Sequence, residues 1–112
     1  MIEALWSVEF GSNLGSIGAG IAVFETGRIL GGDSAFMYIG NYKTENGTVH
    51  SDIHVTKYNN LSHMQSIFGP LTSFHIKVSG KSDQKSMVLT GVVVEQPQLQ
   101  ITIKATRRAE LP

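Results

Sequence analysis

Apolar and polar residues alternate with a period of two along most of this 112-residue chain. The pattern is clearest over 99–106, where Leu, Ile or Ala occupies every second position and Gln, Thr or Lys lies between. Successive side chains of a β-strand point to opposite faces, so this alternation predicts strands with one buried face. We expect strands at 3–10, 17–25, 28–32, 35–43, 48–58, 71–79, 85–95 and 99–106.

Short turns separate these runs and favour pairing between neighbours in sequence. Thr26-Gly27 and Asn46-Gly47 both indicate tight hairpins, and Asn-Gly in particular tolerates the positive φ angles of a type I′ turn. Sequential hairpins produce an antiparallel up-and-down sheet, and closing eight strands into a barrel removes the exposed sheet edges. We therefore predict an all-β fold, an eight-stranded antiparallel up-and-down barrel. A sandwich of two sheets is the alternative architecture.

One segment departs from the alternation and carries apolar residues at about helical spacing, namely Leu61, Met64, Ile67 and Phe68. Ser62 can cap a helix here, so one short helix is expected over 61–68. We also expect a turn at 96–98 and a C-terminal tail over 107–112. No linker or long repeat divides the remainder, and residues 1–112 are predicted to form a single domain.

Charge and cysteine content exclude several classes of protein. Lys plus Arg and Asp plus Glu number 9 each, so no basic excess is present to bind nucleic acid through counterion release. The chain has no Cys, which excludes a disulfide scaffold and a Cys-ligated metal. The N-terminus lacks the features of a secretory signal, and no apolar run approaches the roughly 20 residues of a membrane helix. A soluble, cytoplasmic protein without direct contacts to nucleic acid or membrane is expected.

His50-x-Asp52-x-His54 is the sharpest local pattern. On a strand these three side chains share one face, and two imidazoles with a carboxylate can bind zinc or iron. The same alternation arises wherever a half-buried strand turns its polar face to water, and this interpretation is favoured. We therefore expect no metal site and no cofactor.

Glycines and a neighbouring aspartate form two further motifs. The glycines of 15–20 superficially resemble a phosphate-binding loop, but they lead into a predicted strand where such a loop requires a helix. Glycine there favours a strand bend or close packing. Asp33 follows Gly31-Gly32, and its expected role is to accept hydrogen bonds from nearby backbone amides in a turn. With no nucleophile motif present, an enzyme is not expected.

Aromatic residues fall mostly on apolar strand faces, where packing in the core is their default role. If the barrel is hollow, Trp6, Phe10 and Phe74 are the predicted lining of a ligand cavity. Residues 35–42 and 87–94 are apolar on both faces, although a barrel strand buries only one. Their outer faces therefore need cover, from the predicted helix or from a second subunit.

Several motifs together resemble the GrlR-like family of small negative regulators of type III secretion, in the order Gly18-Ala19-Gly20-Ile21-Ala22-Val23, Gly27, Gly31-Gly32-Asp33 and Tyr38-Ile39-Gly40. The resemblance implies a calycin-like or lipocalin-like barrel with an apolar interior that forms a homodimer. It also implies regulation through a protein partner, such as a transcriptional regulator, without catalysis. Regulator members of the family can carry an acidic surface run just after the Tyr-x-Gly strand, which is linked to partner recognition. Here that stretch is 43–47 with a single acid, and Glu45 and Asn46 are the corresponding partner-binding candidates.

Three hypotheses about function follow from the sequence. The first is a non-enzymatic regulatory or interaction protein that acts by binding a partner protein. The second is a barrel that binds a small apolar, lipid-like ligand. The third, a metal-dependent enzyme built on His50, Asp52 and His54, is the least favoured.

Overall fold

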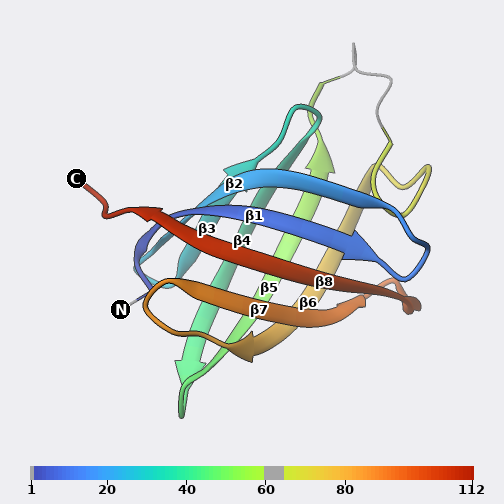
Figure 1. Cartoon of the computed structure of the whole chain (residues 1–112). Coiled ribbons are helices and arrows are strands. Elements are labelled where there is room, and N and C mark those ends of the chain that lie inside the picture. Colours follow the sequence, from blue (N-terminus) through green and yellow to red (C-terminus); the bar gives the residue numbers. More distant parts are fainter. Residues whose placement is uncertain (1, 60–64) are drawn as a thin grey trace.

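The structure is a computed structural model that describes residues 2–59 and 65–112. Within these ranges the chain forms eight strands: β1 (Ala4–Ser12), β2 (Ile17–Glu25), β3 (Arg28–Gly32), β4 (Phe36–Glu45), β5 (Thr48–Lys57), β6 (Ser73–Lys81), β7 (Ser86–Val93) and β8 (Gln96–Ala109). Each strand pairs antiparallel with its sequence neighbours, and β1 also pairs with β8, which closes a barrel (Figure 1). The predicted up-and-down barrel is confirmed. The sandwich alternative is wrong, because hydrogen-bonded pairing continues around the whole ring.

The two predicted hairpin turns adopt the backbone geometry that their residues favour. Thr26 and Gly27 have φ angles of 51° and 78°, and Asn46 and Gly47 have φ angles of 53° and 78°. Positive φ at both central residues is the signature of a type I′ turn, whose twist matches that of the flanking strands. These turns set the register in which β2 pairs with β3 and β4 pairs with β5.

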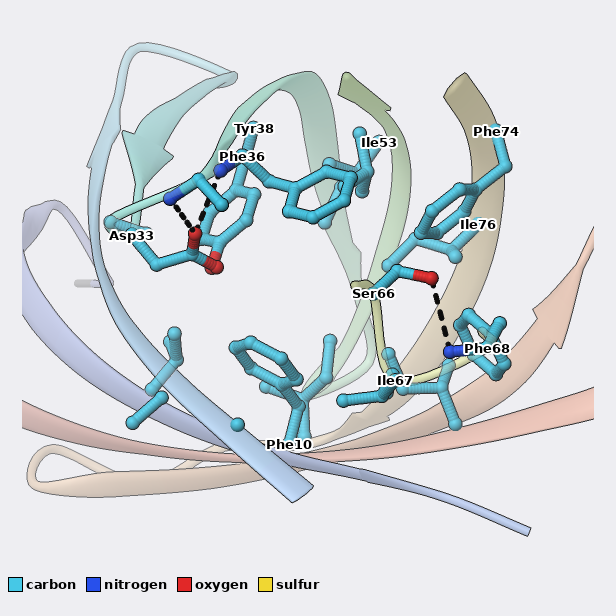
Figure 2. Close-up of a pocket in the computed structure, with 18 of the residues that line it drawn as sticks. Phe10, Asp33, Phe36, Tyr38, Ile53, Ser66, Ile67, Phe68, Phe74 and Ile76 are labelled. Carbon is cyan, nitrogen blue, oxygen red and sulfur yellow. Dashed lines mark hydrogen bonds between the residues drawn. The ribbon is translucent and has the colours of Figure 1, made fainter. Parts of the chain in front are cut away.

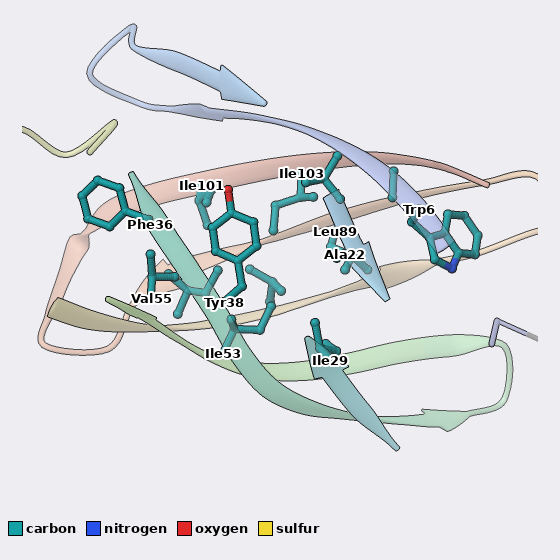
Figure 3. Close-up of a cluster of buried hydrophobic side chains, with 14 of the residues drawn as sticks. Trp6, Ala22, Ile29, Phe36, Tyr38, Ile53, Val55, Leu89, Ile101 and Ile103 are labelled. Carbon is teal, nitrogen blue, oxygen red and sulfur yellow. The ribbon is translucent and has the colours of Figure 1, made fainter. Parts of the chain in front are cut away.

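Alternate residues of the strands fill the barrel interior. On β8, Ile101, Ile103 and Ala105 are buried and the residues between them are exposed, as the alternation predicts. Figure 3 shows the two isoleucines directed into the same core as Leu89 of β7 and Ile53 of β5. The strands on opposite sides of the ring therefore share one hydrophobic core.

Strand β2 carries apolar residues on both faces, and in its first half, 17–21, the bulkier ones lie outside. Ile17 and Ile21 are 86% and 51% exposed. The inward positions are held by Gly18 and Gly20, followed by the buried Ala22. Apolar character alone therefore does not identify the inner face of this strand.

The predicted short helix is wrong for the part of 61–68 that the structure describes. Residues 61–64 lie outside the described residues, and Ile67 and Phe68 form a tight turn bridged by Ser66 and Gly69. The Ser66 side chain competes with helix formation by accepting the Phe68 N–H at 3.1 Å. Gly69 then takes a φ of 81°, which ends any helical path.

The boundaries of β8 also differ from the prediction. The β7–β8 turn is Val94-Glu95, and the expected turn at 96–98 is already strand, because Val93 pairs with Gln96. At the other end, β8 continues to Ala109, which pairs with Leu5 of β1. The expected tail therefore starts later than 107. Among the described residues, nothing forms a helix long and apolar enough to cross a membrane.

Candidate functional site

The two ends of the barrel are built differently. The β1–β2, β3–β4 and β7–β8 turns and the Ser66–Gly69 turn gather at one end, called here the cavity end (Figure 1). The β2–β3, β4–β5 and β6–β7 turns gather at the other, the Trp6 end. A cavity of about 150 Å³ lies inside the barrel, lined in part by the 33–36 and 65–68 segments.

The cavity walls are predominantly apolar. Figure 2 shows aromatic and aliphatic side chains from separate elements around one central space, among them Phe10, Phe36, Ile53, Phe68, Phe74 and Ile76. Polar groups are confined to Asp33, Ser34, Tyr38, Gln65 and Ser66 among the described lining residues. Binding pockets for small molecules commonly combine an apolar lining with a few placed polar groups.

Two of the three predicted lining residues contact this cavity and the third does not. Phe10 of β1 and Phe74 of β6 are lining residues. Phe10 meets the Tyr38 ring edge-on at 6.2 Å between centroids, and Phe74 meets Phe68 edge-on at 5.4 Å. Trp6 instead fills the opposite end of the barrel (Figure 3), where it is fully buried and its indole N–H donates to the Ile2 carbonyl at 2.8 Å. The alternation placed it on the correct face but could not tell which end of the barrel is filled.

Asp33 supplies the most organised polar contact of the cavity. Its Oδ1 accepts the backbone N–H groups of Ala35 and Phe36, each at 2.8 Å. Its Oδ2 accepts the hydroxyl of Tyr38 at 2.5 Å. The expected turn role of Asp33 is confirmed, and the Tyr38 contact adds a link from the turn to the barrel interior. Burial, followed by the hydrogen bond and the negative charge of Asp33, raises the pKa of Tyr38 far above its usual range.

Two glycines make room for these side chains. A Cβ atom on Gly18 would lie 2.5 Å from the Phe10 ring, and one on Gly20 would lie 2.6 Å from the Tyr38 hydroxyl. Both glycines lie within β2 and lead into no helix. The phosphate-loop interpretation therefore fails, and close packing is the role that the structure supports.

His50, Asp52 and His54 do lie on one outer face of β5 but do not converge. His54 stacks on His75 of β6 at 4.3 Å between ring centroids, and its Nε2 contacts the hydroxyl of Ser73 at 2.9 Å. Asp52 approaches Lys77 at 3.9 Å. Across the described ranges, no three His, Cys, Asp or Glu side chains are grouped to hold a metal.

Glu45 and Asn46 lie at the Trp6 end, away from the cavity. Glu45 pairs with Lys43 at 3.3 Å, and the Asn46 carbonyl contacts the Lys81 ammonium at 3.5 Å. Asn46 also supplies the positive φ of the β4–β5 turn. A structural role thus accounts for Asn46, and partner binding by this pair stays a prediction.

An apolar surface on β2, β3 and β4, called here the outer patch, consists of Ile21, Val23, Leu30, Met37 and Ile39. Leu30 pairs with both Val23 and Ile39, so these three form a row across neighbouring strands. Leu30 and Ile39 are 48% and 50% exposed. The sequence predicted an apolar outer face for β4 but did not identify β2 and β3 as its extension. No described element covers the patch.

The residues that line the cavity determine what chemistry it supports. The described lining residues offer apolar walls, one carboxylate and a few neutral polar groups, which is a combination for noncovalent binding. The carboxylate accepts three hydrogen bonds from the protein. No family model and no curated protein matches this chain.

Proposed function

We propose that this protein binds a small apolar molecule inside its β-barrel. The observation that carries the proposal is the cavity of about 150 Å³ with its predominantly apolar walls. An apolar cavity of roughly this volume holds a molecule the size of benzene. Eight strands also give a barrel interior wide enough for one small ligand.

The energetic cost of an empty cavity supports this proposal. Protein interiors are normally packed at the density of organic crystals. Cavity cost scales at about 24 cal/mol per Å³, so a void of this size costs roughly 3–4 kcal/mol of stability. A ligand that fills the space restores the lost contacts and offsets that cost.

Toluene is a suitable first probe, because it matches the volume and has no polar group. We expect toluene to raise the melting temperature and to shift the NMR signals of Phe10 and Phe74. Val55→Phe places a larger side chain in the cavity wall and should abolish these effects. Val88→Phe, an exposed position on β7, is the matched control and should leave them unchanged. A wild-type protein on which neither toluene nor its alcohol, benzyl alcohol, has any effect would refute ligand binding.

Protein–protein interaction is a second candidate function, and the outer patch favours it. We propose that the partner on this surface is a second copy of the chain. The five patch residues carry no charge, so two patches can meet about a two-fold axis without like-charge repulsion. An exposed apolar surface that spans three strands is typical of interfaces.

Sedimentation equilibrium tests the dimer. The wild-type protein should dissociate reversibly from dimer to monomer on dilution, and Leu30→Glu should be monomeric at the same concentrations. Val88→Glu is the control, because β7 lies on the opposite side of the ring from β3. A wild-type protein that stays monomeric at millimolar concentration would exclude this interface.

The resemblance to the GrlR-like family extends the second candidate to a regulatory role. In this proposal the dimer binds a protein partner, such as a transcriptional regulator, through Glu45 and Asn46. The side chain of Glu45 is exposed at the end of β4, next to the β4–β5 turn, which supports its availability. A native pull-down should recover a partner that Glu45→Lys loses and Glu110→Lys, at an exposed site beyond β8, retains. Recovery that is unaffected by Glu45→Lys would reject this contact.

A further inference from the structure

The chemistry of the cavity wall limits what kind of molecule the barrel can hold. This inference rests on the proposed binding of an apolar ligand and concerns the group that such a ligand carries. Asp33 is the one charged residue among the described lining residues. In Figure 2 its carboxylate lies beside the Tyr38 hydroxyl at the edge of the central space. No Lys, Arg or His of the described lining faces it to neutralise its charge.

The carboxylate also has hydrogen-bonding capacity to spare. An ionised carboxylate offers about four acceptor sites. The protein uses three of them, through the N–H groups of Ala35 and Phe36 and the hydroxyl of Tyr38. One acceptor site therefore remains on Oδ2, which accepts a single hydrogen bond. Asp33 itself is a lining residue of the cavity.

A ligand with its own carboxylate would face the Asp33 carboxylate here. Two negative charges close together repel each other, and apolar walls screen them less than bulk water does. A hydroxyl or ammonium group on the ligand would instead donate into the remaining acceptor site. Hydrogen bonds to a charged acceptor are among the stronger ones.

We propose that the barrel selects small apolar molecules of about one ring that carry a single hydrogen-bond donor, an alcohol or an amine, and rejects the corresponding carboxylates. The apolar walls supply affinity for the ring or short chain. Asp33 supplies the discrimination between head groups, and the Tyr38 hydroxyl holds the carboxylate in place for that contact.

A matched series of probes tests the proposal on the wild-type chain without any substitution. Toluene, benzyl alcohol, benzylamine and benzoate share one ring and differ in the attached group. By calorimetric titration, benzyl alcohol or benzylamine should bind at least about tenfold more tightly than toluene, because one hydrogen bond to a charged group is worth that much. Benzoate should bind more weakly than toluene.

Asp33→Asn is the variant that should remove the discrimination. The asparagine amide oxygen can still accept the N–H groups of Ala35 and Phe36, so the turn is retained. The substitution removes the negative charge of Asp33. The ratio of the affinities for benzyl alcohol and benzoate should therefore fall by about tenfold or more. Asp83→Asn is the matched control.

Asp83 is a closely matched control because its side chain accepts two backbone N–H groups in a turn at the Trp6 end, as Asp33 does at the cavity end. Asp83 Oδ1 accepts the N–H groups of Lys85 and Ser86 at 2.7 and 2.8 Å. Asp83→Asn therefore removes one charge from an equivalent turn that does not line the cavity. The order of the four probes should remain that of the wild-type protein.

The outcomes separate the two proposals. If none of the four probes binds, ligand binding itself is wrong. If toluene binds and benzoate binds as tightly as benzyl alcohol, the barrel is a ligand site but Asp33 does not select the head group. Unchanged selectivity in folded Asp33→Asn would equally overturn the role of Asp33.

Discussion

The hydroxyl of Tyr38 donates to Oδ2 of Asp33 at 2.5 Å, which ties the β3–β4 turn to a side chain inside the barrel. Asp33 lies in this turn, and Tyr38 lies on β4 five positions later. A second tyrosine, Tyr58, donates to the backbone carbonyl of Asp33 at 2.7 Å from the exposed side. Hydrogen bonds from one tyrosine inside the barrel and from another at the surface thus both fix the position of Asp33.

Tyr38→Phe should lower the free energy of unfolding by about 2 kcal/mol, because it removes a buried hydrogen bond to a charged group. Tyr58→Phe removes a hydrogen bond to the same residue at an exposed site and should cost less than about 1 kcal/mol. Urea unfolding of both variants measures the difference. Equal losses in the two variants would show that burial of the Tyr38 contact adds nothing.

Alkaline pH should destabilise the protein through the same tyrosine. The pKa of Tyr38 is raised above the ordinary value of 10.0, chiefly by burial. Above pH 10 the unfolded chain therefore releases a proton that the folded chain retains, and the free energy of unfolding falls as pH rises. Urea unfolding from about pH 8 to about pH 11 should show this slope.

Substitutions assign that alkaline slope to individual residues. Burial also raises the pKa of Tyr42, so Tyr38→Phe and Tyr42→Phe should each flatten the slope in part. A variant Tyr38→Phe with the full wild-type slope would contradict the assignment to Tyr38.

Gly20→Ala should destabilise the barrel by about 1–3 kcal/mol, the usual cost of overpacking. The added Cβ would lie 2.6 Å from the Tyr38 hydroxyl and 2.8 Å from the Gly32 carbonyl oxygen, and the latter is backbone that moves little. Gly11→Ala is the control, because its Cβ would have ordinary contacts of 3.7 Å or more. Thermal unfolding compares the two, and similar melting temperatures would argue against the close approach.

The barrel itself could be predicted because its determinants are local. Alternation over 99–106 and the positive-φ turn at Asn46-Gly47 depend only on neighbouring residues, and both are found as expected. The end of β8 could not be predicted in this way. Arg107 to Ala109 belong to the sheet because β1 offers them a partner from across the chain. The helix prediction failed for the described part of its segment because spacing alone ignored the Ser66 side chain.

The candidate site was predicted in part for the same reason. Periodicity placed Phe10 and Phe74 on an inner face, and the structure brings both to the cavity. Trp6 shares the inner face but fills the opposite end of the barrel. Periodicity gives the face of a residue and does not give its position along the barrel axis. The turn signal predicts that Asp33 accepts backbone amides, but it does not predict the hydrogen bond from Tyr38. That contact depends on the direction that the next strand takes.

Acid should weaken the contact between the β7–β8 turn and β6. The backbone N–H of His75 and then its ring lower the pKa of Glu95 from 4.5 to about 2. A lowered pKa contributes stability above pH 4.5 that is lost as pH falls toward about 2. Glu95→Gln should flatten the acid dependence of unfolding in this window. His75→Gln keeps the backbone donor and should flatten it less; an unchanged profile in Glu95→Gln would exclude this linkage.

Ser51→Ala should stabilise the protein, because the Ser51 hydroxyl is the one buried side-chain oxygen or nitrogen without a hydrogen-bond partner in the described part of the chain. Ser51 is 2% exposed and lies on the inner face of β5 between Val49 and Ile53. Desolvating an unpaired hydroxyl costs about 1–3 kcal/mol, so its removal should raise the free energy of unfolding by about 1 kcal/mol. Ser79→Ala, on the outer face of β6, should change little. Destabilisation by Ser51→Ala would mean that the hydroxyl has a partner after all, such as a bound water.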